Sequence, residues 1–468
     1  MLYVYFLIAV LFSGSIFLLK NKKWMHFLVY GFNLMQLIFA IYLYRHLGTF
    51  EIAYFKYDSI SVLFAFILAI LSFVAAVHYQ IYEYNQQQSI RTVQIHNAVY
   101  IGFNVALMGV YLSSQYGLLW AFVEATTLTG ATLIYHDRKK IVLEAVWKYV
   151  FACSVSITLA FVGILLLSVA VQKVGLSDLS FDLLKSNALQ MDPIWLKSAF
   201  LFILVGFSVK MGIIPMFNVD IDAKDVAPFP ISALFSSVLL NAGFLAVYRF
   251  YQMFQITSIK PWMNHVLLIA GVLTLLFAAA YLLKVKNYKR MYAYSSMEHA
   301  GLVIIALTLG KVGILAAFLH LTFHAIVKSG LFFQVGQIMR LNNRVKINIT
   351  GYFYQNPFGG LLLLFGSLAI LGLPPSGLFI SELLIFKELL LQQNWILVVL
   401  ILIALTVIFY ILLKDVFKLL FYPATQKFET DLKGTVVENS LQLMLVVLSI
   451  YFGIFQNHYL FDLIQASI

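Results

Sequence analysis

The sequence predicts an all-α polytopic membrane protein, a single membrane domain of about fourteen transmembrane helices. Composition is the first reason: 62% of the 468 residues are hydrophobic and 11% are charged, whereas a soluble domain carries about 25% charged residues. The second is length, because the apolar residues gather in stretches of about 20 residues, which is enough to cross a bilayer. The third is that basic residues fall mainly between those stretches, where they set the topology.

The predicted spans follow one another without a linker or a low-complexity run. The first stretch has the length of a signal peptide, but no Lys or Arg precedes it, and Lys20, Lys22 and Lys23 follow it. This charge pattern predicts a retained span with the N-terminus outside. We expect the spans at residues 2–19, 24–43, 59–77, 94–112, 116–134, 145–170, 195–217, 229–250, 263–283, 291–309, 313–338, 358–390, 395–414 and 438–455.

Several basic loops are predicted to lie on the same, inner side of the membrane. Alternation of the spans places Arg138–Lys140, Lys284–Arg290 and Arg340–Lys346 together on that side. The longest outer loop is expected at about 171–194. An even number of spans then puts the C-terminus outside as well, in a protein of the cell's inner (plasma) membrane.

Charge and cysteine content exclude two classes of function. The net charge of +11 does not indicate a nucleic-acid partner, because the basic residues serve topology. Cys153 is the only cysteine, so the chain can form no internal disulfide. An iron–sulfur cluster needs several cysteines. We therefore expect no cofactor in this chain, which argues against an integral-membrane redox enzyme.

The seventh span is predicted to be broken within Gly206–Pro215. Pro215 has no N–H, so the carbonyl of Met211 loses its helical partner. Such a break survives in a membrane only where protein or trapped water lines it. Lys210 stands beside the break, and a lysine at the centre of a span costs about 2.5–3.5 kcal/mol to insert. We expect it to face a wet or carboxylate-bearing interior; a snorkelling structural lysine is the alternative.

The twelfth span is predicted to be broken as well, at Leu373–Gly377. Two adjacent prolines there free two carbonyls, and Glu382 lies in the half-helix beyond them. Broken helices in corresponding positions of two repeats are typical of a transport site. Because the two breaks lie five spans apart, the repeats must be inverted. The expected divisions are N-terminal helices at 1–90, five-helix repeats at 94–250 and 263–414, and a C-terminal helix at 438–468.

Acidic residues near the first break are the next candidates. Glu124 lies in the fifth span, where a carboxylate needs a partner or must stay protonated. Lys210 is the natural partner, in a functional role or in a purely structural ion pair. Asp220, Asp222 and Asp225 follow the seventh span and are expected in a solvated loop.

A row of ionisable side chains follows one face of the eleventh span. His320, His324 and Lys328 recur at a spacing of four. Such a row suits proton transfer, because histidine titrates near neutrality. Histidines that simply bond neighbouring helices are the alternative, and a metal is disfavoured because that helix holds no nearby acid. Glu298 and His299 lie about two turns inside the tenth span.

Three of these stretches carry a family resemblance: Val123–Leu128, Lys210–Pro215 and Ala293–His299. With them, about residues 90–420 resemble the antiporter-like membrane subunits of respiratory complex I, multisubunit sodium/proton antiporters and group 4 membrane-bound hydrogenases. The first and third stretches are most similar to the hydrogenase-type F subunit, which is similar to the M and N subunits of complex I.

The resemblance implies roles for the candidate residues. Glu124 and Lys210 match an input pair, the row of the eleventh span matches a link from that pair towards the exit, and Glu382 matches an outlet. The eighth helix of complex I relatives usually carries a central lysine, and Asn241 stands there instead. The full candidate set for proton translocation is Glu124, Lys210, His299, His320, His324, Lys328 and Glu382, with no metal ligand among them.

These observations leave two hypotheses. The first is a proton-translocating, non-redox subunit of a redox-driven complex. Its partners would be other membrane subunits and a peripheral redox arm that carries flavin, clusters and quinone chemistry. The alternative is a component of a secondary sodium/proton antiporter or of an inorganic-carbon uptake transporter. Sodium would require several hard oxygen ligands at one break, and the sequence leaves proton against sodium open.

Overall fold

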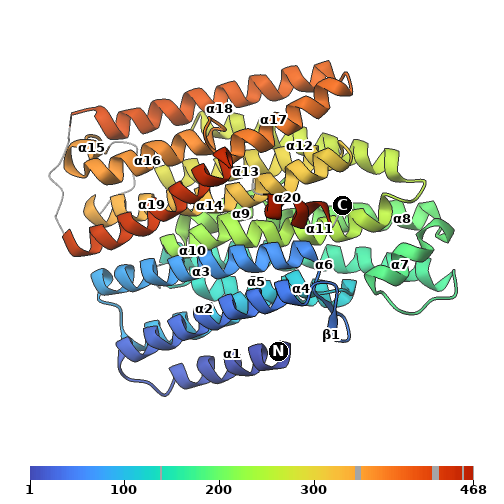
Figure 1. The fold of residues 1–468 in the computed structure, drawn as a ribbon, viewed down its shortest axis with the longest axis horizontal. Coiled ribbons are helices and arrows are strands. Elements are labelled where there is room, and N and C mark those ends of the chain that lie inside the picture. Colours follow the sequence, from blue (N-terminus) through green and yellow to red (C-terminus); the bar gives the residue numbers. More distant parts are fainter. Residues whose placement is uncertain (137–139, 343–348, 424–431, 456–457, 467–468) are drawn as a thin grey trace.

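The computed structural model describes residues 1–136, 140–342, 349–423, 432–455 and 458–466. The chain is a bundle of helices that run side by side along one axis (Figure 1). Each predicted span corresponds to one helix or to consecutive helical segments, so the predicted fold class is confirmed. The first six spans are α1 (Leu2–Ile16), α2 (Lys22–Arg45), α3 (Ser59–Gln86), α4 (Ile90–Leu112), α5 (Tyr116–Ile134) and α6 (Lys140–Gln172).

The remaining spans include two that are interrupted. The seventh is α8 (Pro193–Met211) with α9 (Phe217–Val226), and the twelfth is α16 (Pro357–Ile370) with α17 (Gly377–Leu391). The eighth is continuous through α10 (Phe229–Leu234), the π-helical η2 (Phe235–Leu239) and α11 (Leu240–Phe254). The others are α12 (Lys260–Leu282), α13 (Tyr288–Leu307), α14 (Lys311–Asn342), α18 (Trp395–Phe421) and α19 (Leu432–Ile454).

Short elements connect or follow the spans. An antiparallel hairpin joins α2 to α3, and the expected outer loop at 171–194 contains helical turns; neither feature was predicted. Their bounds are β1 (Phe50–Ile52), β2 (Phe55–Lys56), α7 (Phe181–Asn187) and the 3-10 helix η1 (Ala188–Gln190), followed later by α15 (Tyr352–Gln355) and α20 (His458–Gln465).

Within the described ranges, 11 helices are long and apolar enough to cross a membrane, judged by length and composition alone. Two more, α1 and α16, are apolar but shorter. The tenth span, α13, is polar for its position because it carries Glu298 and His299. The helices that fall below this criterion are therefore the short, broken or polar ones.

Several predicted helix ends differ from the structure, among them that of α18, which runs to Phe421 although the span was expected to end at 414. The first span ends at Ile16 rather than 19, and α3 runs on to Gln86, well past the expected end at 77. The extension of α3 is stable because polar side chains there, including His78 and Glu83, are buried against neighbouring helices. Burial of a polar extension depends on tertiary packing, which hydropathy does not detect.

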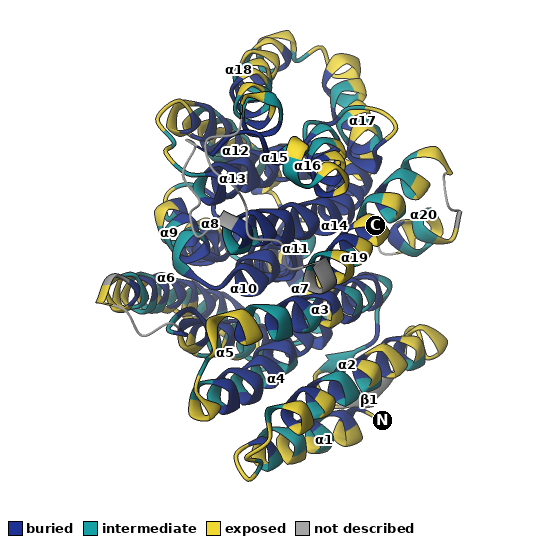
Figure 2. Cartoon of the chain, turned by 90° about the vertical axis from the view of Figure 1, so that its left-hand side faces the viewer, coloured by how far each residue is buried: buried dark blue, intermediate teal, exposed yellow. Residues whose placement is uncertain are grey.

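The most buried helices lie at the centre of the bundle. An 18-residue stretch of the segment 229–254 is buried completely and one of α14 is 94% buried, whereas the corresponding stretch of α18 is 33% buried. Figure 2 shows exposed residues concentrated on peripheral helices such as α1, α6 and α18. The candidate ionisable residues therefore lie mainly where the protein, and not lipid, surrounds them.

The two interrupted helices run in opposite directions, α8 to α9 from right to left in Figure 1 and α16 to α17 from left to right. This arrangement agrees with the inversion of the two predicted repeats. The exact divisions at 94–250 and 263–414 stay predictions.

Candidate functional site

Lys210 lies in the last turn of α8, directly before the first break. The helix ends because Gly212 adopts a left-handed conformation (φ 69°) and donates its N–H to the carbonyl of Ser208. Pro215 cannot donate a backbone hydrogen bond, so the helix does not resume until Phe217. The predicted break is therefore confirmed, and it leaves Lys210 only 1% exposed.

The direct partner of Lys210 is Tyr149, a residue that the sequence did not single out. The Lys210 Nζ donates to the Tyr149 hydroxyl at 3.2 Å, and it lies 5.2 Å from the centre of that ring. Among the described residues, Glu124 makes no ion pair with Lys210. Glu124 and Asp220 nevertheless act electrostatically on the ammonium. The implied Glu124–Lys210 pair is thus a longer-range interaction in this structure.

Glu124 is held by hydroxyl groups instead. Thr127 donates to one carboxylate oxygen at 3.2 Å, and Ser154 of α6 donates to the other at 3.4 Å. The side chain is half-buried, and both of its carboxylate oxygens accept from hydroxyl groups. Two weak neutral donors hold it loosely, which leaves it free to approach or leave Lys210.

The expectation of a solvated loop after the seventh span is wrong. Asp220, Asp222 and Asp225 lie on helix α9, where Asp222 and Asp225 both pair with Arg290 of α13. Asp220 is buried and forms an ion pair with Lys224, which is 0% exposed. The spacing of four between an acid and a base is a helix signal that the sequence contained.

The irregular backbone of the first break is satisfied by neighbouring groups. The N–H of Ile214 donates to the Thr274 hydroxyl of α12 at 3.1 Å. Asp220 packs so tightly against Gly212 that a Cβ there would stand 2.6 Å from its carboxylate oxygen. The break therefore brings Asp220 against the backbone next to Lys210.

Buried polar atoms without partners lie between the two halves. Both amide atoms of Asn241 and both ring nitrogens of His324 lack hydrogen bonds within the described protein, and both residues are 0% exposed. Buried polar groups are normally satisfied by protein or ordered water. These side chains therefore mark places that suit internal water molecules.

Lys328 of α14 is hydrogen-bonded to helix α13 at the centre of the second half of the site, which is the part formed by the second predicted repeat. Its ammonium donates to the Ser295 hydroxyl at 2.9 Å and to the Tyr292 carbonyl at 3.2 Å. It is 0% exposed and has no carboxylate in direct contact among the described residues. A completely buried ammonium held by neutral acceptors is costly, so Lys328 stays a candidate functional residue.

The histidines of α13 and α14 form a hydrogen-bonded chain. Ser381 donates to the Leu378 carbonyl at 2.8 Å, so its oxygen must accept the proton of His320 Nδ1 at 3.0 Å. The other nitrogen of His320, Nε2, is then an acceptor and receives the proton of His299 Nδ1 at 3.0 Å. The order His299, His320, Ser381 is a continuous path along which a proton can move.

Glu382 joins this chain from the second broken helix. It follows the break between α16 and α17, and its carboxylate packs against Gly372, where a Cβ would stand 2.1 Å away. Ligand atoms of His299, His320 and Glu382 all lie within 4.8 Å of one another. Helix α14 itself holds no acid, as the sequence indicates, but Glu382 of α17 comes close to the histidines in the folded bundle.

Those three residues could supply ligands to a metal ion, since two histidines and a carboxylate are a common zinc set. The Nδ1 of His299 and the Nε2 of His320 lie 3.0 Å apart, which is hydrogen-bond distance.

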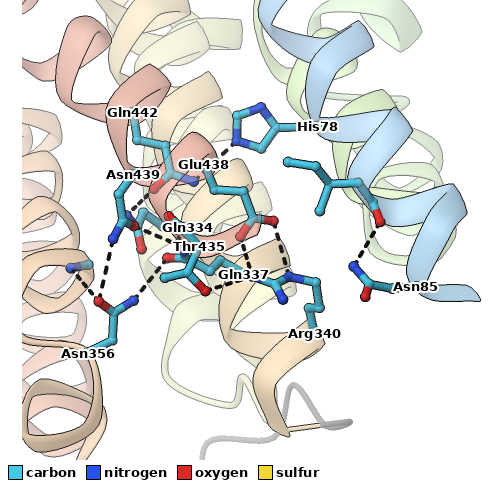
Figure 3. Close-up of polar contacts among 12 residues, drawn as sticks. His78, Asn85, Gln334, Gln337, Arg340, Asn356, Thr435, Glu438, Asn439 and Gln442 are labelled. Atoms are coloured by element: carbon cyan, nitrogen blue, oxygen red, sulfur yellow. Dashed lines mark hydrogen bonds and ion pairs between the residues drawn. The ribbon is translucent and has the colours of Figure 1, made fainter. Parts of the chain in front are cut away.

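A second polar cluster lies around the C-terminal part of α14. Arg340 donates to both carboxylate oxygens of Glu438, at 3.3 and 2.6 Å, and Gln337 donates to Asn439 at 2.9 Å (Figure 3). His78 of α3 lies beside Gln442 in the same cluster. These contacts join α19 and α3 to α14 and do not include Lys328. We interpret the cluster as structural, since its members bond one another.

Comparison with known proteins agrees with this geometry. Over 396 residues the chain is 31% identical to the hydrogenase-4 component F homolog of Methylacidiphilum infernorum (isolate V4), covering 81% of each. One similar structure belongs to a membrane-bound sulfane sulfur reductase, an archaeal respiratory membrane complex (TM-score 0.89, 23% identity, covering 100% of this chain and 96% of that chain). Another belongs to the Mrp complex of Dietzia sp. DQ12-45-1b (TM-score 0.87, 14% identity, with the same coverage). At these identities the structures establish the fold.

Fold and site together define a class, that of multi-pass, antiporter-like membrane subunits. The family described as NADH:quinone oxidoreductase/Mrp antiporter, TM, matches residues 113–408, well over half of the chain. The chain belongs to this family, and the resemblance seen in its sequence is confirmed. The roles of the individual site residues stay predictions.

Proposed function

We propose that the chain is a proton-translocating subunit of a redox-driven membrane complex. The observation that supports this best is a series of ionisable groups that extends from one broken helix to the other and is buried except at Glu382, which is partly exposed. It begins at Lys210, continues through Lys328 and the histidine chain, and ends at Glu382. Its members come from both predicted repeats. Electrostatic interactions through Asp220 and Lys224 connect Lys210 to Lys328, and Lys328 interacts in turn with the histidines.

The chemistry of the series favours protons over sodium ions. Its ligand atoms are mostly amines and imidazoles, whereas sodium requires several hard oxygen ligands at one place. Lysine and histidine bind and release protons, and the unpartnered atoms of Asn241 and His324 suit water molecules that carry protons onward. We therefore assign the series to proton transfer.

The first step of the proposed mechanism takes place at Lys210. The Tyr149 hydroxyl accepts from the ammonium and holds it at the break. Movement of the loosely held Glu124 towards or away from it would change the energy of the charged form. A neighbouring subunit that biases two such arrangements would couple distant redox chemistry to proton release.

The assembly and orientation follow from the same proposal. Other membrane subunits and a peripheral redox arm would carry the electron transfer, since the relatives above are named as parts of hydrogenase and respiratory complexes. We place the chain in the plasma membrane with both termini outside, on the charge distribution of its loops.

A second candidate function is a secondary sodium/proton antiporter component. The similarity to a chain of the Mrp complex supports this second candidate function, although that similarity concerns the fold. The two candidates differ in their energy source and in their ion.

The test is to purify the complex that contains the tagged chain from native membranes and to identify the chains that accompany it. Hydrogenase-like or quinone-reductase chains, with redox-driven proton uptake by proteoliposomes in the absence of sodium, would support the first function. Accompanying chains without redox centres, together with sodium uptake driven by a proton gradient, would replace it with the second.

A further inference from the structure

The ion pair between Asp220 and Lys224 lies at the point where the two halves of the site meet. Both residues belong to α9, the short helix that follows the first break, and they stand one turn apart. Lys224 is 0% exposed and Asp220 is 4% exposed. A buried ion pair adds little net stability, because desolvation of the two charges offsets their attraction. Stability alone therefore does not account for this pair.

On one side, the pair reaches the first half of the site. The Asp220 carboxylate packs against Gly212, two residues beyond Lys210 in the chain. The carboxylate and the Lys210 ammonium interact electrostatically. Asp220 is thus a buried anion between two buried ammonium groups, those of Lys210 and Lys224.

On the other side, the pair reaches the second half. Asp222 and Asp225, which flank Lys224 on α9, pair with Arg290 of α13. Lys328 donates to the Tyr292 carbonyl of that same helix. The Lys224 ammonium acts electrostatically on both Lys328 and His324 of α14. His324 has no hydrogen-bond partner on either ring nitrogen among the described residues, so it can accept a proton delivered to it through water. Lys224 therefore stands between the two halves.

The continuous eighth span, formed by α10, η2 and α11, offers no such carrier at its centre. Gly243 packs against the backbone of Lys210, where a Cβ would stand 2.9 Å from it, so this helix borders the first half directly. Its buried polar residue there, Asn241, is neutral and has no partner among the described residues. An amide can hold water but cannot bind and release a proton in the physiological range.

We propose that Asp220 and Lys224 form the proton relay between the two halves of the site, with Lys224 as the group that passes the proton towards His324. This inference rests on the proposed function of proton translocation. A proton leaving Lys210 reaches the Asp220–Lys224 pair. Lys224 then releases a proton through water to His324, and the arriving proton restores the Lys224 ammonium. No bond other than those to the transferred protons forms or breaks.

The test separates a relay from a structural ion pair by replacing Lys224 with arginine. Lys224→Arg keeps the positive charge and the partner of Asp220, but a guanidinium does not release its proton in proteins. We expect complexes that assemble normally and translocate protons about tenfold more slowly or worse, since a positioned proton carrier contributes about 10²–10⁴-fold. Lys148→Arg is the matched control, because Lys148 forms an exposed pair with Glu144 at the same spacing of four.

Proton uptake is measured with a pH-sensitive dye in everted membrane vesicles and is normalised to assembled complex. Uptake by the Lys224→Arg complex at the rate of the unmodified complex would overturn the relay. If that complex does not assemble, Asp220→Asn is measured in its place. The neutral amide cannot pass a proton to Lys224, so an assembled Asp220→Asn complex with normal uptake would also overturn the relay.

Lys210→Met distinguishes failure of the relay from failure of the proposed function. If Lys210→Met abolishes uptake while Lys224→Arg leaves it normal, only the relay fails. If both complexes translocate protons normally, the proposed function itself fails.

Discussion

The ammonium of Lys210 is bonded to the hydroxyl of Tyr149 at 3.2 Å, while Glu124 interacts with it only at longer range. Tyr149 lies on α6 and lines a surface groove of about 530 Å³ together with Asn218 and Asp222 of α9. The same side chain therefore contacts the buried lysine and borders a hollow on the outside of the bundle. Tyr149 is therefore the residue that separates this groove from the buried Lys210 ammonium and binds that ammonium.

Tyr149→Phe should slow proton translocation about tenfold or more without preventing assembly. The phenyl ring fills the same space, but a hydrogen bond from a charged group is lost, which is worth about 1.5–3 kcal/mol. The measurement is the pH profile of translocation, because a positioning role predicts a displaced profile and not only a lower maximum. Trp147→Phe, on the same groove but without a bond to Lys210, is the control. Equal profiles for all three proteins would show that the hydroxyl does not position Lys210.

Glu124→Gln and Lys210→Met should each damage translocation, and their effects should not add. The two charges act on each other within the protein, and groups that are coupled in this way give non-additive double mutants. Translocation and assembly are measured for all four members of the cycle. Strictly additive losses in equally assembled complexes would mean that the two residues act independently.

Gly243→Ala should destabilise the protein by about 1–3 kcal/mol, the usual cost of overpacking. An added Cβ would stand 2.9 Å from the backbone carbon and the Cβ of Lys210, and backbone cannot easily move aside. Gly330→Ala is the control, since the nearest atoms to its Cβ are 3.8 Å away. Thermal unfolding of both purified variants checks this, and equal midpoints would show that α8 and α11 are not in such close contact.

Glu382→Gln should reduce translocation while leaving the complex assembled. The carboxylate stands within 4.8 Å of ligand atoms of His299 and His320, at the end of the histidine chain. A neutral amide of the same shape preserves packing but cannot take the proton. Glu388→Gln on the same helix is the control. Normal translocation by an assembled Glu382→Gln complex would reject the outlet role.

The topology can be checked by labelling single cysteines in a Cys153→Ser background. Lys286 and Ser186 are exposed, and they stand on loops that charge distribution places on opposite sides. An impermeant thiol reagent should label Lys286→Cys from the cytoplasmic side and Ser186→Cys from the outside. Labelling of both from one side would contradict the inverted arrangement.

The breaks and the ionisable row could be predicted because they depend on local chemistry. Pro215 and the Pro374–Pro375 pair remove backbone donors wherever they stand in a helix, and a spacing of four places His320, His324 and Lys328 on one face. Both features depend only on residues that are close together in the sequence. The structure confirms the two breaks and buries the row completely.

Contacts between distant helices could not be predicted in this way. Tyr149 gave no signal, because an aromatic residue in an apolar span is ordinary, and its role depends on the packing of α6 against α8. Glu382 reaches His299 only in the folded bundle. The Asp220–Lys224 pair could have been predicted from its spacing of four. We expected a solvated loop there instead, because charged residues that follow a span are usually exposed to solvent.

The measurement that tests the central claim most directly is the rate of proton translocation per assembled complex when Lys328 is replaced by methionine. Lys328 is the completely buried ammonium at the centre of the second half, and Ser295 and Tyr292 bind it with neutral oxygens. If protons pass along the buried series, the assembled Lys328→Met complex should translocate them at least about tenfold more slowly. Translocation at the unmodified rate by that complex would contradict the account.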